Sequence, residues 1–138
     1  MYKLSGAQEG VQGQRLRGLD FRLQIAYLQA FIWWLLKYPN GHRPIITDGY
    51  RDDDEQAELY AQGRTTPGPI VTYKLPGQSK HNRTPAQALD IGFLNRNGQL
   101  DWNPAIFQEF AQLVKKANGG VKWGGDWPDW KDRPHFEV

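Results

Sequence analysis

The chain has 138 residues, of which 39% are hydrophobic and 23% are charged, and this length and composition suit a folded domain with one moderate core. Its 17 basic and 15 acidic residues give a net charge of +2 at pH 7, which is too balanced for a protein that binds nucleic acid through its charge. The chain has no cysteine, which excludes disulfide bonds, cysteine-ligated zinc sites and thiol nucleophiles. Any metal site must therefore use histidine and carboxylate ligands.

The N-terminal part predicts an irregular lead-in followed by one long helix. Residues 1–14 are rich in Gly and Gln, and we expect them to be irregular. A wide apolar face predicts a buried helix from about Leu16 to Tyr38, which the following Pro-Asn-Gly turn ends. The most apolar stretch, residues 25–36, is shorter than the roughly 18 residues that a membrane-spanning helix needs, and no cleavage site follows it. We therefore expect neither a signal peptide nor a stable membrane association.

The middle of the chain predicts a strand, a capped helix and a long loop. Residues 44–51 are rich in Ile and Thr, which favours a strand. The acidic run at residues 52–55 has the spacing of a capping box, so a short helix should begin here and end at Gly63. Residues 64–85 predict a long loop with a short extended piece at 70–73, and loops of this length are often functional.

The C-terminal half predicts further strands and one helix. In chain order, these are a strand at Ala86–Phe93, a turn at Asn97-Gly98, a helix that begins at Asn103-Pro104 and ends at residues 118–120, and two short strands at 121–124 and 134–138. Asn is a good helix cap, and Pro suits the first helical position. The whole pattern predicts an α+β fold, with helices flanking a small antiparallel sheet, in a single domain of residues 1–138.

Three polar side chains have the positions and the chemistry of a metal site: His81, Asp90 and His135. In the strand that contains Asp90, positions 89, 91 and 93 carry large apolar residues that would face the core, so alternation directs Asp90 to the opposite face. In the last strand, Phe136 faces the core, and His135 takes the other face together with Glu137. Asp90 and His135 should therefore project into one concave site.

Two histidines and one carboxylate form a ligand set of catalytic zinc, which leaves a fourth position for water. Zinc lowers the pKa of that water toward about 7 and polarises a carbonyl group. Asp132 lies three residues before His135, where its carboxylate is well placed to be a general base. The same ligand set also accepts other divalent ions.

Four motifs, in the same order, resemble those of a known peptidase family. Ser79-x-His81 with Ala88-x-Asp90 resembles the Ser-x-His-x-x-Gly-x-Ala-x-Asp motif of the zinc D-Ala-D-Ala carboxypeptidase and dipeptidase family, which also includes phage endolysins that are L-alanyl-D-glutamate peptidases. The other three are Asp132-x-x-His135, which resembles an acid-x-x-His element, Asp48-Gly-Tyr-Arg51 with the helix after it, and Gly124-Gly-Asp126-Trp127. The likeness covers about residues 44–138.

The resemblance implies a Hedgehog/DD-peptidase-like fold and a role for each matching residue. Zn2+ would be bound by His81, Asp90 and His135. Asp132 would be the catalytic base, and Arg51 would stabilise the oxyanion or hold a substrate carbonyl. Three further residues are expected to bind substrate: Ser79, Asp126 and Trp127. From the residues alone, a surface ion pair for Arg51 and a core position for Trp127 stay open.

One departure from the family motif lies between His81 and Ala88. Six residues, Asn82 to Gln87, separate them here, whereas the family pattern has four. Ala86 takes the position of the motif glycine, and the residues before it would form a longer turn. Because these are turn-forming residues ahead of a strand, we expect them to bulge outward and His81 still to reach Asp90.

The leading hypothesis is a zinc metallopeptidase that hydrolyses the stem peptide of bacterial peptidoglycan at the L-alanyl-D-glutamate bond, as a bacteriolytic endolysin does in cell wall degradation. The closest alternative is a D-Ala-D-Ala carboxypeptidase or dipeptidase of the same family. Hypotheses of another class are a non-catalytic, zinc-stabilised module that binds cell walls and an aromatic-rich module that binds glycans. We expect a monomer with no nucleic-acid partner, made in the host cytoplasm and acting on the wall after release.

Overall fold

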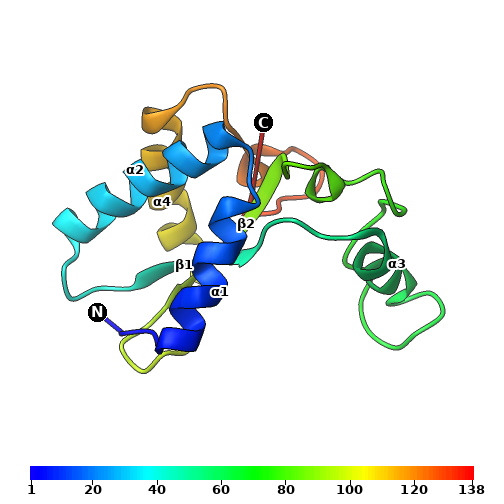
Figure 1. The fold of residues 1–138 in the computed structure, drawn as a ribbon, viewed down its shortest axis with the longest axis horizontal. Coiled ribbons are helices and arrows are strands. Elements are labelled where there is room, and N and C mark those ends of the chain that lie inside the picture. The colour runs from blue at the N-terminus through cyan, green and yellow to red at the C-terminus, as the bar shows by residue number, and fades with distance from the viewer.

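The computed structural model describes all of residues 1–138 as an α+β fold in which four helices flank one antiparallel sheet, as the sequence predicts. The helices are α1 (Gly6–Arg17), α2 (Phe21–Lys37), α3 (Asp53–Ala61) and α4 (Pro104–Ala117), and the strands are β1 (Arg43–Asp48), β2 (Ala88–Leu94), β3 (Lys122–Trp123) and β4 (His135–Glu137). The strand order is β1-β2-β4-β3, and two 3-10 turns, η1 (Lys80–Asn82) and η2 (Gly124–Asp126), precede β2 and β4. Figure 1 shows α2 and α4 at one end of the molecule and α3 with its loop at the other. None of the four helices is both long enough and apolar enough to cross a lipid bilayer.

The core lies between the sheet and the two helices α2 and α4. The helix α4 begins where the sequence predicts, with Asn103 capping its first turn and Pro104 at its first position. Aromatic rings fill the centre of the core, where Phe93 of β2 lies edge-on to Phe107 and Phe110 at centroid distances of 4.9 and 5.5 Å. Burial of an apolar side chain of this size contributes roughly 1.5–3 kcal/mol, so this layer holds β2 and the residues on its other face firmly.

The N-terminal segment differs from the prediction, because residues 1–14 are not an irregular lead-in and residues 16–38 are not one helix. The helix α1 begins after Ser5, which forms a reciprocal capping box with Gln8. A short break separates α1 from α2, and Asp20 caps the first turn of α2. These local bonds between side chains and backbone start each helix, and they outweigh the Gly-rich composition from which irregular structure was expected.

Side-chain bonds hold α1 against β1, the edge strand of the sheet. Gln12 binds the backbone of Ile46 twice, donating from Nε2 to its oxygen at 2.9 Å and accepting from its nitrogen at 2.7 Å. Arg15 donates to the same oxygen at 2.8 Å. Because these bonds satisfy backbone groups that an edge strand otherwise leaves free, α1 covers this edge of the sheet.

The strands β2 and β4 lie side by side, and their register prepares the functional site. Asp90 of β2 is directly opposite His135 of β4. Leu89, Ile91 and Phe93 all belong to the buried core, as strand alternation predicts. Asp90 and His135 therefore leave the sheet on the side away from the core, which is where the sequence puts them.

The segment between α3 and β2 is a long loop, as predicted, but residues 70–73 do not form a strand. Side chains of α3 and the loop itself bind its backbone instead. Gln56 donates to the backbone oxygen of Lys74 at 2.7 Å, and Arg64 donates to that of Thr72 at 3.1 Å. Because side chains already satisfy these carbonyl groups, the segment is ordered without a neighbouring strand.

Candidate metal centre and active-site cleft

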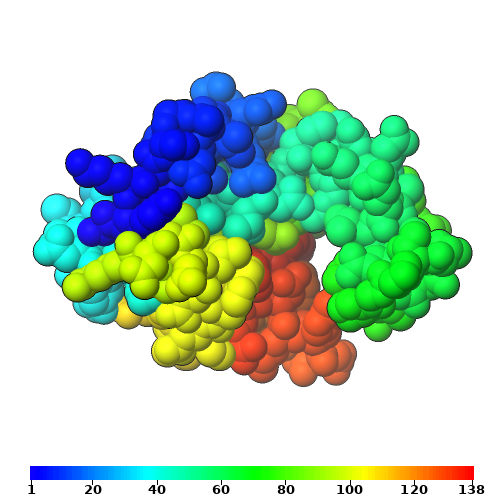
Figure 2. All heavy atoms as spheres, turned by 90° about the horizontal axis from the view of Figure 1, so that it is seen from below, coloured from blue at the N-terminus to red at the C-terminus, as the bar shows by residue number.

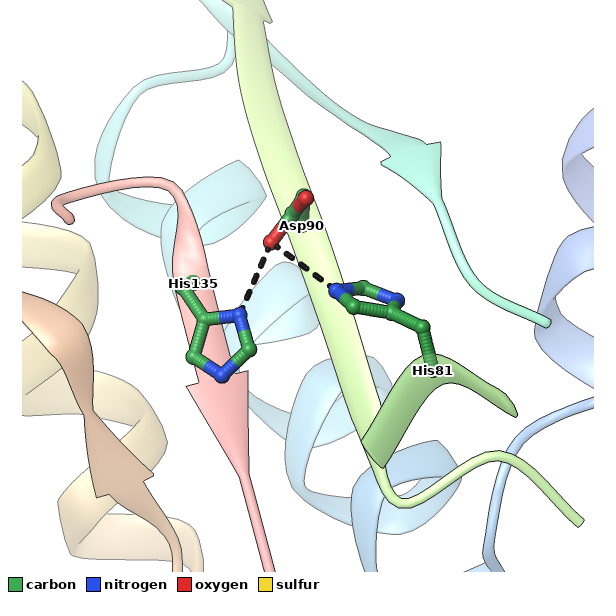
Figure 3. Close-up of side chains that lie close together, drawn as sticks. All are labelled: His81, Asp90 and His135. Carbon is green, nitrogen blue, oxygen red and sulfur yellow. Dashed lines mark hydrogen bonds and ion pairs between the residues drawn. The ribbon is translucent and has the colours of Figure 1, made fainter. Parts of the chain in front are cut away.

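Figure 3 shows the three predicted ligands pointing toward one another from three elements: His81 from η1, Asp90 from β2 and His135 from β4. Each residue offers one potential ligand atom, and these three atoms lie within 4.8 Å of one another. Asp90 Oδ1 is 3.5 Å from His81 Nε2 and 3.2 Å from His135 Nδ1. The two histidines are only 3% and 8% exposed. Two histidines and one carboxylate that converge in this way could hold a metal ion. Their role as metal ligands stays a prediction.

The surroundings of His81 determine which of its ring nitrogens faces the group. Ser79 fixes the backbone here, because its Oγ accepts a bond from the His81 amide at 3.2 Å. The ring Nδ1 is 2.7 Å from the carbonyl oxygen of Gly49, and since that oxygen can only accept, Nδ1 carries the hydrogen. Nε2 is then the unprotonated nitrogen of the neutral ring, and its lone pair is free for a metal on the side of Asp90.

Glu137 orients His135 in the same way. The ring Nε2 of His135 is 2.9 Å from Glu137 Oε2, and since an ionised carboxylate only accepts, Nε2 carries the hydrogen and Nδ1 faces Asp90. Lys80 holds Glu137 in turn, with its Nζ 3.3 Å from Oε1 and a bond of 2.7 Å to the oxygen of Val138. Metal-binding histidines commonly donate their other N–H to a carboxylate or a carbonyl group, and both histidines here do so.

The electrostatics of the group favour a positive charge at its centre. Burial acts to raise the pKa of Asp90, but hydrogen bonds with His135 and His81 outweigh it and hold the pKa well below its usual range. Burial acts to lower the pKa of His135, but Asp90 and Glu137 outweigh it and raise the pKa to about 9. The hydrogen bond with His135 lowers the pKa of Glu137 to about 2. A divalent cation that prefers nitrogen and oxygen ligands fits this set of donors.

The turn between His81 and Ala88 is longer than in the family motif, yet it brings His81 to Asp90. Residues 83–85 are exposed, as expected for an outward bulge. Ala86 is fully buried and is anchored to the break before α2, since its nitrogen donates to Gly18 at 2.9 Å and its oxygen accepts from Asp20 at 2.8 Å. The extra residues therefore leave the approach of His81 to Asp90 intact.

The three residues lie in a cleft of about 530 Å³. Residues 70–74 of the loop after α3 form one wall, and Trp127 and Trp130 form part of the other. In Figure 2, a hollow separates the green segment that contains the first wall from the red segment near the C-terminus. Tyr73 and Trp130 meet at the rim as a T-shaped pair, with ring centroids 5.5 Å apart. The cleft thus combines a polar floor with apolar and aromatic walls.

Asp132, the predicted catalytic base, also lines the cleft. Burial raises the pKa of Asp132, and the negative charge of Asp90 adds to this effect. Its backbone is packed against Gly124, where any side chain would collide with it, and this close approach accounts for a glycine at that position. The structure therefore brings a carboxylate with increased proton affinity to the three candidate ligands.

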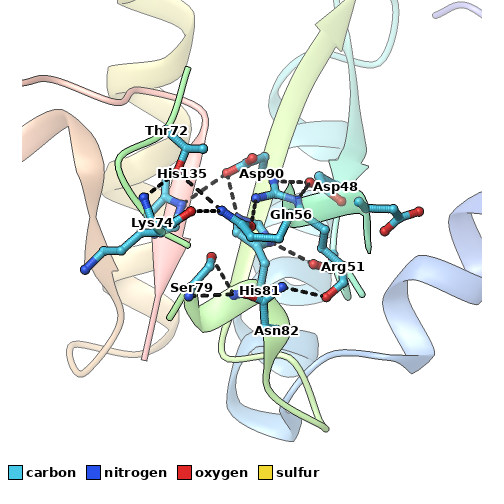
Figure 4. A network of polar contacts seen from close by, with 12 residues as sticks. Asp48, Arg51, Gln56, Thr72, Lys74, Ser79, His81, Asn82, Asp90 and His135 are labelled. Atoms are coloured by element: carbon cyan, nitrogen blue, oxygen red, sulfur yellow. Dashed lines mark hydrogen bonds and ion pairs between the residues drawn. The ribbon is translucent and has the colours of Figure 1, made fainter. Parts of the chain in front are cut away.

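Arg51, the predicted helper for the oxyanion, lines the cleft as well and is held by two neighbours, as Figure 4 shows. Its Nε donates to Asp48 at 3.0 Å, and its Nη1 donates to Gln56 Oε1 at 2.8 Å. The ion pair considered from the sequence is therefore present, but it orients a guanidinium group that also faces the cleft.

Comparisons with known proteins agree with this geometry. A family model described as D-alanyl-D-alanine carboxypeptidase matches residues 74–138, which include the three candidate ligands and Asp132. The peptidoglycan L-alanyl-D-glutamate endopeptidase CwlK of Bacillus subtilis (strain 168) is 40% identical over an alignment of 101 residues, and the match covers 68% of this chain. Residues 74–138 therefore match this peptidase family. The family resemblance drawn from the motifs is thereby confirmed.

A comparison with solved structures bears on the fold. The chain spans 59% of the length of CwlK. The crystal structure of the L-Ala D-Glu endopeptidase ChiX of Serratia marcescens matches with a TM-score of 0.65 at 23% identity, covering 92% of this chain and 85% of ChiX. This structural match confirms the expected peptidase-like α+β fold.

The three predicted substrate-binding residues do not all reach the cleft. Ser79 and Trp127 line it, and the Trp127 ring lies 5.1 Å from that of His135. Asp126 does not line it, because its exposed carboxylate pairs with Lys115 of α4. The structure therefore has two of the three in the cleft, and their role in binding substrate stays a prediction.

The sequence reasoning missed four residues of the cleft region: Gln56, Tyr73, Lys74 and Trp130. Gln56 is fully buried and joins Arg51 to the loop. A glutamine in a short polar helix is ordinarily exposed, so no local signal singled it out. The two aromatic residues were visible only as part of an aromatic-rich composition, since their contact joins segments far apart in the chain.

Proposed function

We propose that this chain is a zinc-dependent peptidase that hydrolyses the L-alanyl-D-glutamate bond in the stem peptide of bacterial peptidoglycan. The observation that carries the proposal is the cleft in which three convergent candidate ligands lie with Asp132 and Arg51. The bond is inferred from the 40% identity to CwlK, whose name states it. Amide hydrolysis requires activation of the carbonyl group, a base for water and stabilisation of the developing charge, and this cleft has residues suited to each task.

We infer that His81 Nε2, Asp90 and His135 Nδ1 hold the metal, and that the metal is zinc. Two histidines and one carboxylate are a common protein ligand set for catalytic zinc. When bound, zinc supplies a Lewis acid that polarises the substrate carbonyl and lowers the pKa of water. The bonds to Gly49 and Glu137 support this assignment, because each engages the other nitrogen of its ring and so directs the ligand nitrogen toward Asp90.

Asp132 is proposed to accept the proton of the attacking water and to pass it to the leaving amine. Its raised pKa supports the role, since a carboxylate in this environment holds a proton more readily than one in water. Arg51 is proposed to stabilise the negative charge that develops on the carbonyl oxygen, because Asp48 and Gln56 hold its guanidinium group ready at the cleft. Ser79 and Trp127 are proposed to contact the peptide.

Digestion of purified peptidoglycan tests the scissile bond. We expect mass spectrometry to detect fragments with a new N-terminal D-glutamate amine. Chelation should abolish their formation, and added zinc should restore it. Zinc-loaded protein that produces no such terminus would contradict the proposal.

The variant Asp132→Asn separates an enzyme from a zinc-stabilised binding module. Loss of a general base lowers hydrolysis by about 10²–10⁴-fold, whereas the metal content should not change. Asp129→Asn is a matched control, because Asp129 is exposed and does not line the cleft. Full activity of Asp132→Asn would show that Asp132 is not the base, and a module that only binds walls would show no hydrolysis in any variant.

A second candidate function is a D-Ala-D-Ala carboxypeptidase, which the description of the matching family model favours. The same digestion distinguishes the two, because this activity releases free D-alanine and leaves the L-alanyl-D-glutamate bond intact. Free D-alanine without the new D-glutamate terminus would favour the second candidate.

We also propose that the chain acts as a bacteriolytic monomer at the cell wall, where its substrate occurs. The three candidate ligands, Asp132 and Arg51 all lie in the cleft of one chain, which supports a monomer. Sedimentation of the active protein should give the mass of a single chain, and a dimer that loses activity on dilution would contradict this part of the proposal.

A further inference from the structure

We propose that Lys74 forms a carboxylate-binding subsite in the cleft, which takes the free α-carboxylate of the D-glutamate residue next to the scissile bond. This inference rests on the proposed function. It identifies the part of the substrate that Lys74 recognises. Lys74 belongs neither to the metal centre nor to the catalytic pair Asp132 and Arg51.

Lys74 is the cation of the cleft that has no carboxylate partner in the protein. The lining contains three basic side chains other than histidine: Arg51, Lys74 and Lys80. Arg51 pairs with Asp48, and Lys80 pairs with Glu137. The ammonium group of Lys74 makes neither an ion pair nor a side-chain hydrogen bond, so it is available to an anionic ligand.

The backbone of Lys74 is fixed, although its side chain is exposed. Its amide donates to Thr72 Oγ1 at 3.1 Å, and its carbonyl oxygen accepts from Gln56 Nε2 at 2.7 Å. The same buried Gln56 accepts from Arg51 at 2.8 Å. Figure 4 shows this chain of bonds, through which a single amide sets the distance between Arg51 and Lys74. With its backbone fixed in this way, the ammonium group can reach only a limited region of the cleft, which suits it to positioning a substrate.

The proposed substrate supplies the matching anion. In the stem peptide, D-glutamate continues the chain through its side-chain carboxyl group, so its α-carboxylate stays free. That carboxylate is three covalent bonds from the carbonyl carbon that is attacked, a span of about 4 Å, and it must therefore lie in the same cleft. Lys74 lines this same cleft.

The charges on the floor of the cleft direct the carboxylate toward the wall with Lys74. Of the three carboxylates on the floor, Asp90 is a candidate metal ligand and Glu137 pairs with Lys80, so Asp132 is the one that would repel a second carboxylate placed beside it. The Tyr73–Trp130 contact lies at the rim of the cleft, at the residue next to Lys74.

Two synthetic stem peptides test the proposal, one with D-glutamate and one with D-isoglutamine, in which an amide replaces the α-carboxylate. We expect kcat/KM of the parent protein to be about tenfold or more higher for the D-glutamate peptide, as expected for a hydrogen bond between charged groups. Lys74→Met should lower kcat/KM for the D-glutamate peptide to the value for the D-isoglutamine peptide. It should not change kcat/KM for the D-isoglutamine peptide. Lys74→Arg should keep part of the preference.

Lys122→Met serves as the matched control, because Lys122 is an exposed lysine of β3 that does not line the cleft. It should keep the full preference of the parent protein. Equal cleavage of the two peptides by the parent protein, or an undiminished preference in Lys74→Met, would overturn the proposal. Cleavage of neither peptide would contradict the proposed function itself, and the inference with it, so the two failures are distinguishable.

Discussion

At the scale of single residues, the metal centre depends on hydrogen bonds as much as on its three candidate ligands. His135 turns Nδ1 toward the group because Glu137 accepts the hydrogen of Nε2 at 2.9 Å. Without that carboxylate the ring can rotate or change tautomer, so fewer molecules have a ring ready to bind a metal. Glu137 is therefore expected to control metal affinity without touching the metal.

Replacing Glu137 tests this role. We expect Glu137→Ala to weaken zinc binding by about 10–100-fold, and Glu137→Gln, which keeps an acceptor but loses the charge, to weaken it by less. Competition with a chelator of known affinity measures the change. Glu58→Gln, on the exposed side of α3, is the matched control and should bind zinc as the parent does. If Glu137→Ala binds zinc as tightly as the parent, His135 needs no such partner.

Sequence reasoning located residues well where strand direction alone decided their position. Alternation along β2 and β4 put Asp90 and His135 on one face, and the structure has them there. Asp126 could not be located in this way, because it lies in a 3-10 turn and its direction follows from a contact with Lys115. Lys74 gave no signal either, since the bonds that fix its backbone come from the side chain of Gln56 on another element and from Thr72.

At the scale of elements, periodicity predicted α4, β2 and β4 but not the break between α1 and α2. Apolar residues at positions 16, 19 and 23 continue the helical spacing through the break, so the local pattern reads as one helix. The break exists because Leu19 pairs with Ala86, and the backbones of Gly18 and Asp20 bind Ala86 on either side. A contact between segments this far apart in the chain leaves no trace in the local pattern.

The helix α2 is apolar on both faces, and only one face should matter for stability. Leu23 is fully buried, whereas Ile25 is 49% exposed. We expect Leu23→Ala to lower the free energy of unfolding by about 2–5 kcal/mol, because it leaves a cavity in the core. Ile25→Ala should change it by about 0.5 kcal/mol or less. Urea denaturation measures both, and equal losses would mean that the outer face of α2 is covered in solution.

At the scale of the whole molecule, the candidate ligands join parts of the chain that the sheet alone does not hold together. Asp90 and His135 belong to paired strands, but His81 lies in η1, at the end of the long loop. A metal bound to all three would tie that loop to the centre of the sheet. Because such a site exists only in the folded protein, the free energy of metal binding adds to the stability of the fold.

Metal removal should therefore lower the melting temperature of the whole protein. Zinc at about 100 times its Kd contributes about 2.7 kcal/mol, which for a chain of this size corresponds to roughly 5–10 °C in Tm. Calorimetry with chelator, and again after zinc is restored, measures the shift. His81→Ala should abolish the response, whereas His42→Ala should keep it, because His42 binds Asp101 and does not line the cleft. A shift of the parent's size in His81→Ala would mean that zinc stabilises the protein at another site.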